Sequence, residues 1–137
     1  RSSAPARQLD AAWTAVIEQL SSGELSGLPL VVGGRSAGAR VACRTAGATG
    51  AVGVLCLAFP LQPPPRAGKP AGEDRLAELE AVHVPTLVVQ GERDRFGMPS
   101  AADGREVVEV PGDHSLRKDT GAVADAARGW LSRLATA

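Results

Sequence analysis

The stretch from Leu28 to Ala46, LPLVVGGRSAGARVACRTA, constrains the fold most. Its apolar beginning predicts a short strand over residues 28–33, and the small residues after Ser36 predict a helix. Gly34 and Gly38 flank the serine at a distance of two residues, which gives a Gly-x-Ser-x-Gly pattern. We expect a sharp turn here, because the two glycines remove side chains that would collide around it. Such a turn places the serine at a helix N-terminus, where free N–H groups favour a developing negative charge.

The Gly-x-Ser-x-Gly pattern has two interpretations on its own. The serine of an ordinary strand–turn–helix junction caps the helix that follows it, and the pattern arises by chance in a chain with 16 glycines. Alternatively, the serine is a nucleophile at the tip of the turn. The pattern alone does not decide between them.

The rest of the chain alternates between helix and strand patterns. Residues 8–20 carry one apolar stripe at helical spacing, which predicts a helix packed on a flat surface. Residues 51–59 are almost continuously apolar, which is typical of a central parallel strand covered on both faces. The same patterns predict a helix directly after Ser36, a helix over 73–82, strands over 86–90 and 105–110, and a C-terminal helix. This order predicts an α/β fold with a parallel sheet and helices on both faces.

Length and composition limit the class of protein. A chain of 137 residues predicts a single domain over residues 1–137. Lys and Arg number 15, as do Asp and Glu, and no basic run stands out, which argues against a nucleic-acid partner. There is no apolar run of membrane-spanning length and no apolar signal-peptide core at the N-terminus. Cys43 and Cys56 lie apart in apolar segments, which favours reduced core residues of a cytoplasmic protein.

Three residues of complementary chemistry follow three of the predicted strands. Ser36 follows the first strand, Asp94 the third and His114 the fourth. Because parallel strands end along one edge of a sheet, we expect these side chains to meet there. The combination is a hydroxyl nucleophile, a base and an acid that orients the base, in the chain order Ser, Asp, His.

Other titratable residues fit this edge less well. His83 precedes the third strand, so we expect it at the opposite edge and on the surface. Asp113 is adjacent to the candidate base, and a carboxylate one residue away rarely reaches the same ring. Glu92 and Asp103 are less well placed than Asp94.

A loop rich in proline and glycine over residues 61–72 is a candidate wall of a binding site, with a simple linker as the equal alternative. The candidate pocket residues are Arg35, Phe59 and Leu61. Arg35, beside the serine, would suit an acidic substrate, although an exposed turn arginine is the default interpretation. Phe96 and Met98 are expected to pack within their own loop.

Three segments taken together carry a family resemblance: VVGGRSAGARVA, PTLVVQGERDRFG and VPGDHSL. With these motifs in series, the chain resembles the C-terminal half of an α/β-hydrolase and is similar to bacterial serine hydrolases related to dienelactone hydrolases. Dienelactone hydrolases carry a cysteine nucleophile, whereas this sequence has Ser36, so that substrate does not carry over.

The resemblance implies a role for each candidate residue. Ser36 would attack an acyl carbon, His114 would take its proton, Asp94 would orient the imidazole, and the Ala37 N–H would be one oxyanion donor. It implies hydrolysis of an ester, thioester or related acyl bond of a small molecule, with no cofactor. Nor do the cysteines and histidines form a metal site, because they lie in separate contexts.

The chain also departs from the family pattern. The family has about eight strands, while four are predicted here, and the N-terminal strands with the second oxyanion donor are missing from these residues. Strand 28–33 would become an exposed apolar edge, so we expect a homodimer or pairing with a missing N-terminal segment along it. Residues 95–104 contain no amphipathic helix, which suggests that residues are missing there.

Two other functions stay open. A hydrolase-fold protein that binds without catalysis would suit the incomplete fold. A nucleotide-binding domain would use residues 33–38 as a phosphate loop, but the chain lacks both G-x-G-x-x-G and the P-loop lysine.

Overall fold

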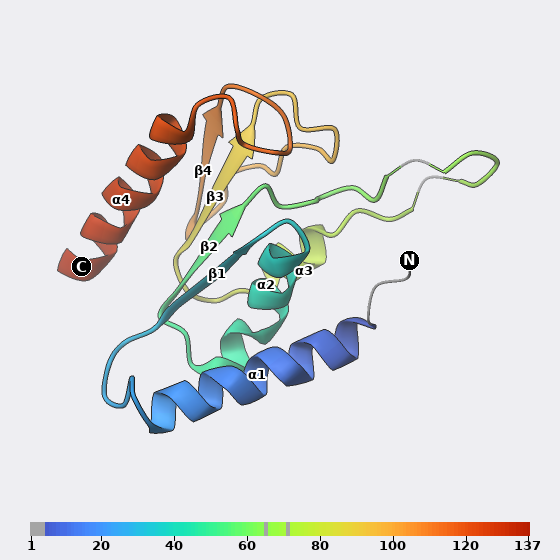
Figure 1. The fold of residues 1–137 in the computed structure, drawn as a ribbon. Helices are drawn as coiled ribbons and strands as arrows, with labels where there is room; N and C mark the ends of the chain where they lie inside the picture. The colour runs from blue at the N-terminus through green and yellow to red at the C-terminus, as the bar shows by residue number, and fades with distance from the viewer. Residues whose placement is uncertain (1–4, 65, 71) are drawn as a thin grey trace.

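Four parallel strands form one sheet in the order β1-β2-β3-β4 (Figure 1). The computed structural model describes residues 5–64, 66–70 and 72–137. The strands are β1 Val31–Arg35, β2 Gly53–Leu57, β3 Thr86–Gly91 and β4 Arg105–Val110. Each pairs in parallel with its neighbour in sequence. The predicted parallel sheet is therefore confirmed, and the carboxyl ends of all four strands lie along one edge.

Helices cover both faces of the sheet, as predicted. Three of them lie on one side and the fourth on the other (Figure 1). They are α1 Ala6–Ser22, α2 Ala37–Thr49, α3 Leu76–Glu80 and α4 Thr120–Thr136. Within the described ranges no helix is long and apolar enough to cross a bilayer.

The alternation of side chains along the strands builds a core on each face. Val88 belongs to the cluster under α2, while Leu87 and Val89 belong to the cluster under α4, because successive strand residues point to opposite faces. All six residues of β3 are buried. The strand that carries Gln90 is thus the best-covered element of the fold.

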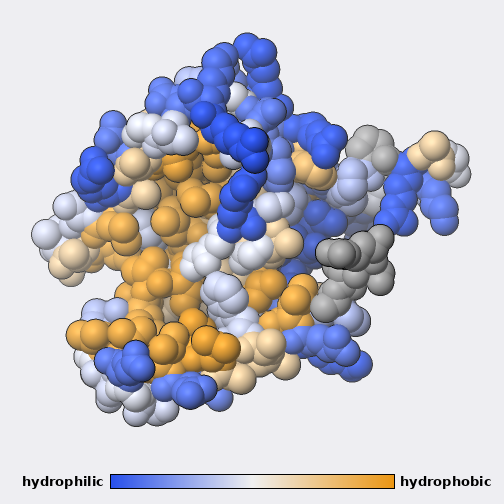
Figure 2. Space-filling model, viewed as in Figure 1, coloured by the Kyte–Doolittle hydropathy of each residue, from blue (hydrophilic) through white to orange (hydrophobic). Residues whose placement is uncertain are grey.

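The strand over residues 51–59 is shorter than predicted and less completely covered. β2 ends at Leu57 because Ala58 takes a positive φ of 55° and turns the chain. Helix α4 packs mainly on β3 and β4, so Leu55 and Leu57 stay half-buried. Figure 2 shows apolar side chains gathered between α4 and α1 on this side.

The N-terminal helix packs on α2 instead of on the sheet. Trp13 and Ile17 reach the core, but Leu9 and Val16 of its apolar stripe stay exposed. Four charged side chains complete the attachment by joining α1, α2 and α3 through ion pairs of 2.8–3.1 Å: Asp10, Arg40, Arg44 and Glu78. We refer to these four residues as the helix ion-pair network.

Residues 92–104 carry the chain from β3 back to β4 without a helix. The connection must span the length of one six-residue strand, about 20 Å at 3.3 Å per residue. An extended chain of this length reaches about 43 Å, so the distance is easily covered. This segment is therefore long enough to join β3 to β4 without the missing residues that the sequence suggests for 95–104.

Cys43 and Cys56 are free thiols in the core between α2 and β2, as predicted. Their sulfur atoms lie 3.5 Å apart. The hydrogen bond that Cys56 shares with Cys43, together with burial, raises the pKa of Cys56 well above its usual value. Both cysteines therefore serve as small apolar core residues.

Candidate active site

Ser36 occupies the turn between β1 and α2 in a strained conformation. Its backbone has φ 55° and ψ −117°, a positive φ that costs a non-glycine residue roughly 1–3 kcal/mol. The surrounding backbone holds it there: the Ser36 N–H donates to the Leu57 carbonyl at 2.9 Å, and its own carbonyl accepts from the Ala39 N–H at 3.0 Å. The side chain is thereby presented at the sheet edge where the strands end.

The two glycines of the turn have different roles. A Cβ on Gly34 would lie 2.3 Å from the Gly38 carbonyl carbon and 2.8 Å from the Ala39 nitrogen, which leaves no room for any side chain. A Cβ on Gly38 would meet no atom within 4 Å. The expected steric reason therefore applies to Gly34, and it is wrong for Gly38.

Ser36, His114 and Asp94 form a continuous row of hydrogen bonds. The Ser36 Oγ lies 2.8 Å from His114 Nε2, and His114 Nδ1 lies 2.7 Å from Asp94 Oδ2. The Asp94 side chain is fully buried, while 19% of the His114 side chain is exposed. With the Nδ1 proton donated to the carboxylate, Nε2 accepts from the hydroxyl. The structure thus brings together the three residues that the sequence places after β1, β3 and β4.

Gln90 is a site residue that sequence reasoning missed. Its amide nitrogen donates to Asp94 Oδ2 at 3.1 Å, to the Phe59 carbonyl at 2.8 Å and to the Gly97 carbonyl at 2.9 Å. Its amide oxygen accepts from the Phe59 N–H at 2.9 Å. The Phe96 N–H donates to Asp94 Oδ1 at 2.8 Å, so both carboxylate oxygens are held. The available signal was an amide side chain at the carboxyl end of a strand, TLVVQG, whose other polar side chain is the threonine at its beginning.

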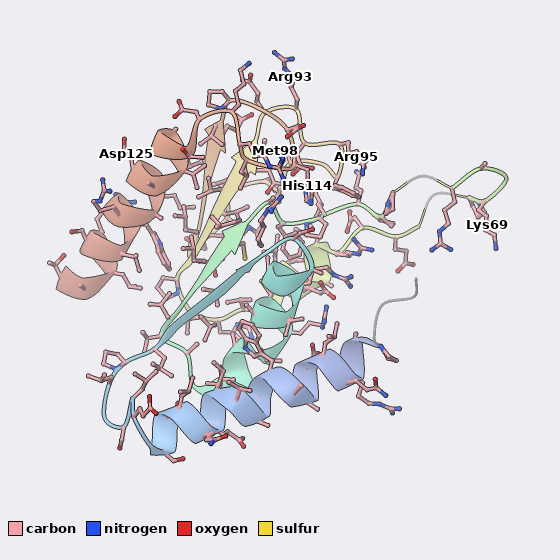
Figure 3. The ribbon with its side chains drawn as sticks, in the orientation of Figure 1. Lys69, Arg93, Arg95, Met98, His114 and Asp125 are labelled. Carbon is pink, nitrogen blue, oxygen red and sulfur yellow. The ribbon has the colours of Figure 1, made fainter. Side chains whose placement is uncertain are left out.

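Phe96 packs on the candidate base as well as within its own loop. Its ring centroid lies 4.4 Å from that of His114 at an interplanar angle of 57°. The Arg95 guanidinium carbon lies 4.9 Å from the centroid of the same aromatic ring. Figure 3 shows Arg95 and Met98 near His114 at the end of the sheet. The loop after β3 therefore supplies both the acid and an aromatic wall beside the imidazole.

The alternative acids and base lie elsewhere. The Asp113 carboxylate accepts hydrogen bonds from the Ser115 hydroxyl at 2.6 Å and its N–H at 2.9 Å, which lower the pKa of Asp113. Glu92 is exposed. His83 and Asp103 are also exposed and precede β3 and β4, at the opposite edge of the sheet.

The candidate pocket residues have different surroundings. Phe59 is fully buried in the core under α2, so it does not line an open pocket, contrary to expectation. Leu61 is half-buried against the same core, and Arg35 is exposed at the end of β1. The Ala37 N–H is the first of helix α2 and has no intrahelical acceptor, which leaves it available to an oxyanion.

Residues 1–127 match the family model of the alpha/beta hydrolase domain. An α/β serine hydrolase without a lid from Xanthomonas campestris has a TM-score of 0.67 and 20% identity, covering 95% of this chain and 60% of its own. An α/β serine hydrolase homologue from Coxiella burnetii has a TM-score of 0.61 and 17% identity, and the match covers 97% of this chain and 61% of the homologue. The thioesterase domain from the curacin biosynthetic pathway has a TM-score of 0.57 and 18% identity, and the match covers 86% of this chain and 70% of that domain.

These solved structures share the fold at low identity. The chain spans less than two thirds of the first two of them and 70% of the third. No curated protein matches the sequence.

Proposed function

This chain belongs to the alpha/beta hydrolase family, and on that premise we propose that it hydrolyses ester, thioester or related acyl bonds with Ser36 as its nucleophile. The observation that carries the proposal is the row of hydrogen bonds from Asp94 through His114 to Ser36. A buried acid, a base with one exposed side and a serine in a strained turn are the parts that covalent acyl transfer requires.

In the first half of the proposed reaction, the Ser36 Oγ attacks the acyl carbon while His114 Nε2 takes the hydroxyl proton. The tetrahedral intermediate carries an oxyanion, which accepts a hydrogen bond from the Ala37 N–H at the start of α2. Asp94 keeps the imidazole in the required tautomer and stabilises the imidazolium. His114 then gives the proton to the leaving oxygen or sulfur as its bond to the acyl carbon breaks.

In the second half, water attacks the acyl carbon of the acyl-Ser36 intermediate. His114 takes a proton from the water and returns it to the Ser36 oxygen as the carbon–oxygen bond breaks. The products are the free acid and the regenerated serine.

A fluorophosphonate probe tests the nucleophile directly. We expect covalent labelling of the wild-type chain, no labelling of Ser36→Ala, and labelling of a control variant, Ser115→Ala, which keeps the row of hydrogen bonds intact. Ser36-dependent release of nitrophenolate from 4-nitrophenyl acetate would show turnover. Labelling that persists in Ser36→Ala would contradict Ser36 as the nucleophile, and a wild-type chain that is never labelled would support the non-catalytic binding alternative.

We also propose that the free edge of β1 pairs with another strand, supplied by a second copy of this chain or by a separate N-terminal segment. β1 is an edge strand of the four-stranded sheet. Leu28 is 59% exposed and Val31 38%, which are large values for apolar side chains beside an open edge.

A further inference from the structure

A cationic hollow lies beside the candidate active site. The loop between β2 and α3 and the loop after β3 border an open hollow of about 800 Å³. Its lining includes four cationic side chains and one carboxylate: Arg66, Lys69, Arg75, Arg95 and Asp74. We refer to this space as the cationic hollow. The chain as a whole has a net charge of zero, so the positive charge here is a local concentration.

The four cations lack carboxylate partners among the residues that the structure describes. None of them takes part in the ion pairs found there. The Asp74 carboxylate accepts a hydrogen bond from the Leu76 N–H at 3.1 Å, at the beginning of α3. By contrast, Arg40 and Arg44, on nearby α2, are both paired with carboxylates. The lining of the hollow thus carries an excess of positive charge.

Arg75 fixes part of this charge in place. Its Nη1 donates to the Pro60 carbonyl at 3.0 Å, and its backbone N–H donates to the Leu61 carbonyl at 2.7 Å. Burial lowers the pKa of Arg75, and the positive charge of Arg40 lowers it further as the second-largest cause. An anion in the hollow would offset both effects, because an opposite charge nearby stabilises the protonated guanidinium.

The hollow adjoins the candidate base through one aromatic side chain. The Gln62 N–H donates to the Phe96 carbonyl at 2.8 Å, which ties the loop between β2 and α3 to the loop after β3. Arg95 lies over the Phe96 ring, and that ring lies on His114. Figure 3 shows Arg95 and Lys69 on the same side of the molecule, with Arg95 closer to His114. The cationic hollow and the candidate base are therefore linked through contacts of Phe96 with Gln62, Arg95 and His114.

We propose that the cationic hollow binds an anionic group, a carboxylate or a phosphate, of the acyl substrate. This inference rests on the proposed function and adds the substrate class to it. This anionic group would lie at the end of the substrate that is away from the scissile bond. Its binding would orient the scissile bond over Ser36.

A binding titration tests the hollow without turnover. The Ser36→Ala chain is titrated by NMR with sodium glutarate and with inorganic phosphate, at constant ionic strength. We expect saturable shifts in residues 61–75 and 92–98, and affinity reduced by about tenfold or more in a chain that also carries Arg66→Glu and Lys69→Glu. The matched control adds Arg7→Glu and Arg128→Glu, which change the net charge equally but lie on α1 and α4.

The titration has decisive outcomes. Tighter binding of glutarate identifies a carboxylate site, and tighter binding of phosphate identifies a phosphate site. Absence of saturable binding by both anions, or equal loss of affinity in the control, would overturn the proposal.

A kinetic comparison separates this inference from the proposed function. We expect the wild-type chain to favour mono-4-nitrophenyl glutarate over neutral 4-nitrophenyl pentanoate in kcat/KM. The Arg66→Glu, Lys69→Glu chain should lose that preference by about tenfold or more, and the Arg7→Glu, Arg128→Glu chain should keep it. Equal kcat/KM for both esters would overturn the anion site alone. No Ser36-dependent hydrolysis of either ester would overturn the proposed function, and the titration would then decide the anion site.

Discussion

Gln90 donates a hydrogen bond to Asp94 through the carboxylate oxygen that also binds His114. The amide that makes this bond is fully buried and also bonds the backbone of Phe59 and Gly97. One side chain of β3 therefore joins the end of β2, the loop after β3 and the candidate acid. We infer that Gln90 is a positioning residue, which acts on the base through Asp94.

Replacing Gln90 with leucine should lower kcat by about 10-fold to 100-fold while KM changes little, since Gln90 orients the acid without facing the open site. The free energy of unfolding should fall by about 1–3 kcal/mol, because buried backbone groups lose their partners. The downfield NMR signal of the His114 Nδ1 proton should shift in Gln90→Leu. Thr86→Val, which removes a buried hydroxyl at the other end of β3, should reduce stability and leave kcat and that signal unchanged. Unaltered kcat in Gln90→Leu would contradict the positioning role.

Asp94→Asn should lower kcat by about four orders of magnitude, because an amide favours the wrong imidazole tautomer while the shape of the site is kept. Asp113→Asn is the matched control, since its carboxylate binds Ser115 and does not join the row of hydrogen bonds. Steady-state hydrolysis of a 4-nitrophenyl ester measures both. A larger loss in the control than in Asp94→Asn would exchange the roles of the two acids.

Gly34→Ala and Gly38→Ala should differ in stability. The new Cβ at residue 34 would meet backbone atoms of Gly38 and Ala39, and relieving such overpacking costs about 1–3 kcal/mol. At residue 38 the added methyl group would contact no other atom. This residue belongs to helix α2, and alanine is favoured over glycine in a helix by up to about 1 kcal/mol. Urea unfolding of both variants gives the comparison. Equal destabilisation would mean that the turn tolerates neither side chain.

Glu78 should make stability depend on pH through the helix ion-pair network. Burial alone would raise the pKa of Glu78, but hydrogen bonds from Arg40 and Arg44 outweigh it and lower that pKa. A lowered pKa in the folded state contributes stability above the unfolded value of 4.5, and this contribution is lost as pH falls through the folded value. Glu78→Gln should therefore reduce the free energy of unfolding at neutral pH more than at about pH 3. Glu80→Gln, on the exposed side of α3, serves as control, and a pH-independent effect of Glu78→Gln would refute the linkage.

The free edge of β1 should make the 14.0 kDa chain associate. Sedimentation of the wild type should show a concentration-dependent species larger than the monomer, and Val31→Lys should shift it towards the monomer, since an edge lysine opposes strand pairing. Leu131→Lys places the same charge on an equally exposed residue of α4 and should have no effect. A wild-type chain that stays an ordered monomer at all concentrations would contradict pairing along β1.

The sequence predicted the elements that depend on local pattern. Strand 105–110 has the predicted bounds, and the strand ends carry Ser36, Asp94 and His114 to one edge, because a parallel sheet leaves no other arrangement. The interpretation of Phe59 as a pocket residue was wrong, because the backbone after β2 turns its side chain into the core.

Long-range contacts explain what the pattern did not reveal. Gln90 bonds Phe59 across 31 residues of sequence, and no periodicity encodes such a contact. The helix over residues 73–82 shortened to Leu76–Glu80, where Asp74 binds the Leu76 N–H and Ala81 ends the helix. The packing of α1 on α2 includes the ion pair of Asp10 with Arg44, and Glu78 of α3 binds the same arginine, so these contacts become visible only once three helices are placed together.

β1 is at once the edge of the sheet and the strand that ends in Ser36. Whatever pairs with this edge becomes the immediate neighbour of the nucleophile, so assembly and chemistry share one element. Specific activity would then follow mass action and vary with enzyme concentration instead of staying constant. A dilute kinetic assay and a concentrated binding experiment would sample different species of the same chain, so both belong on one concentration series.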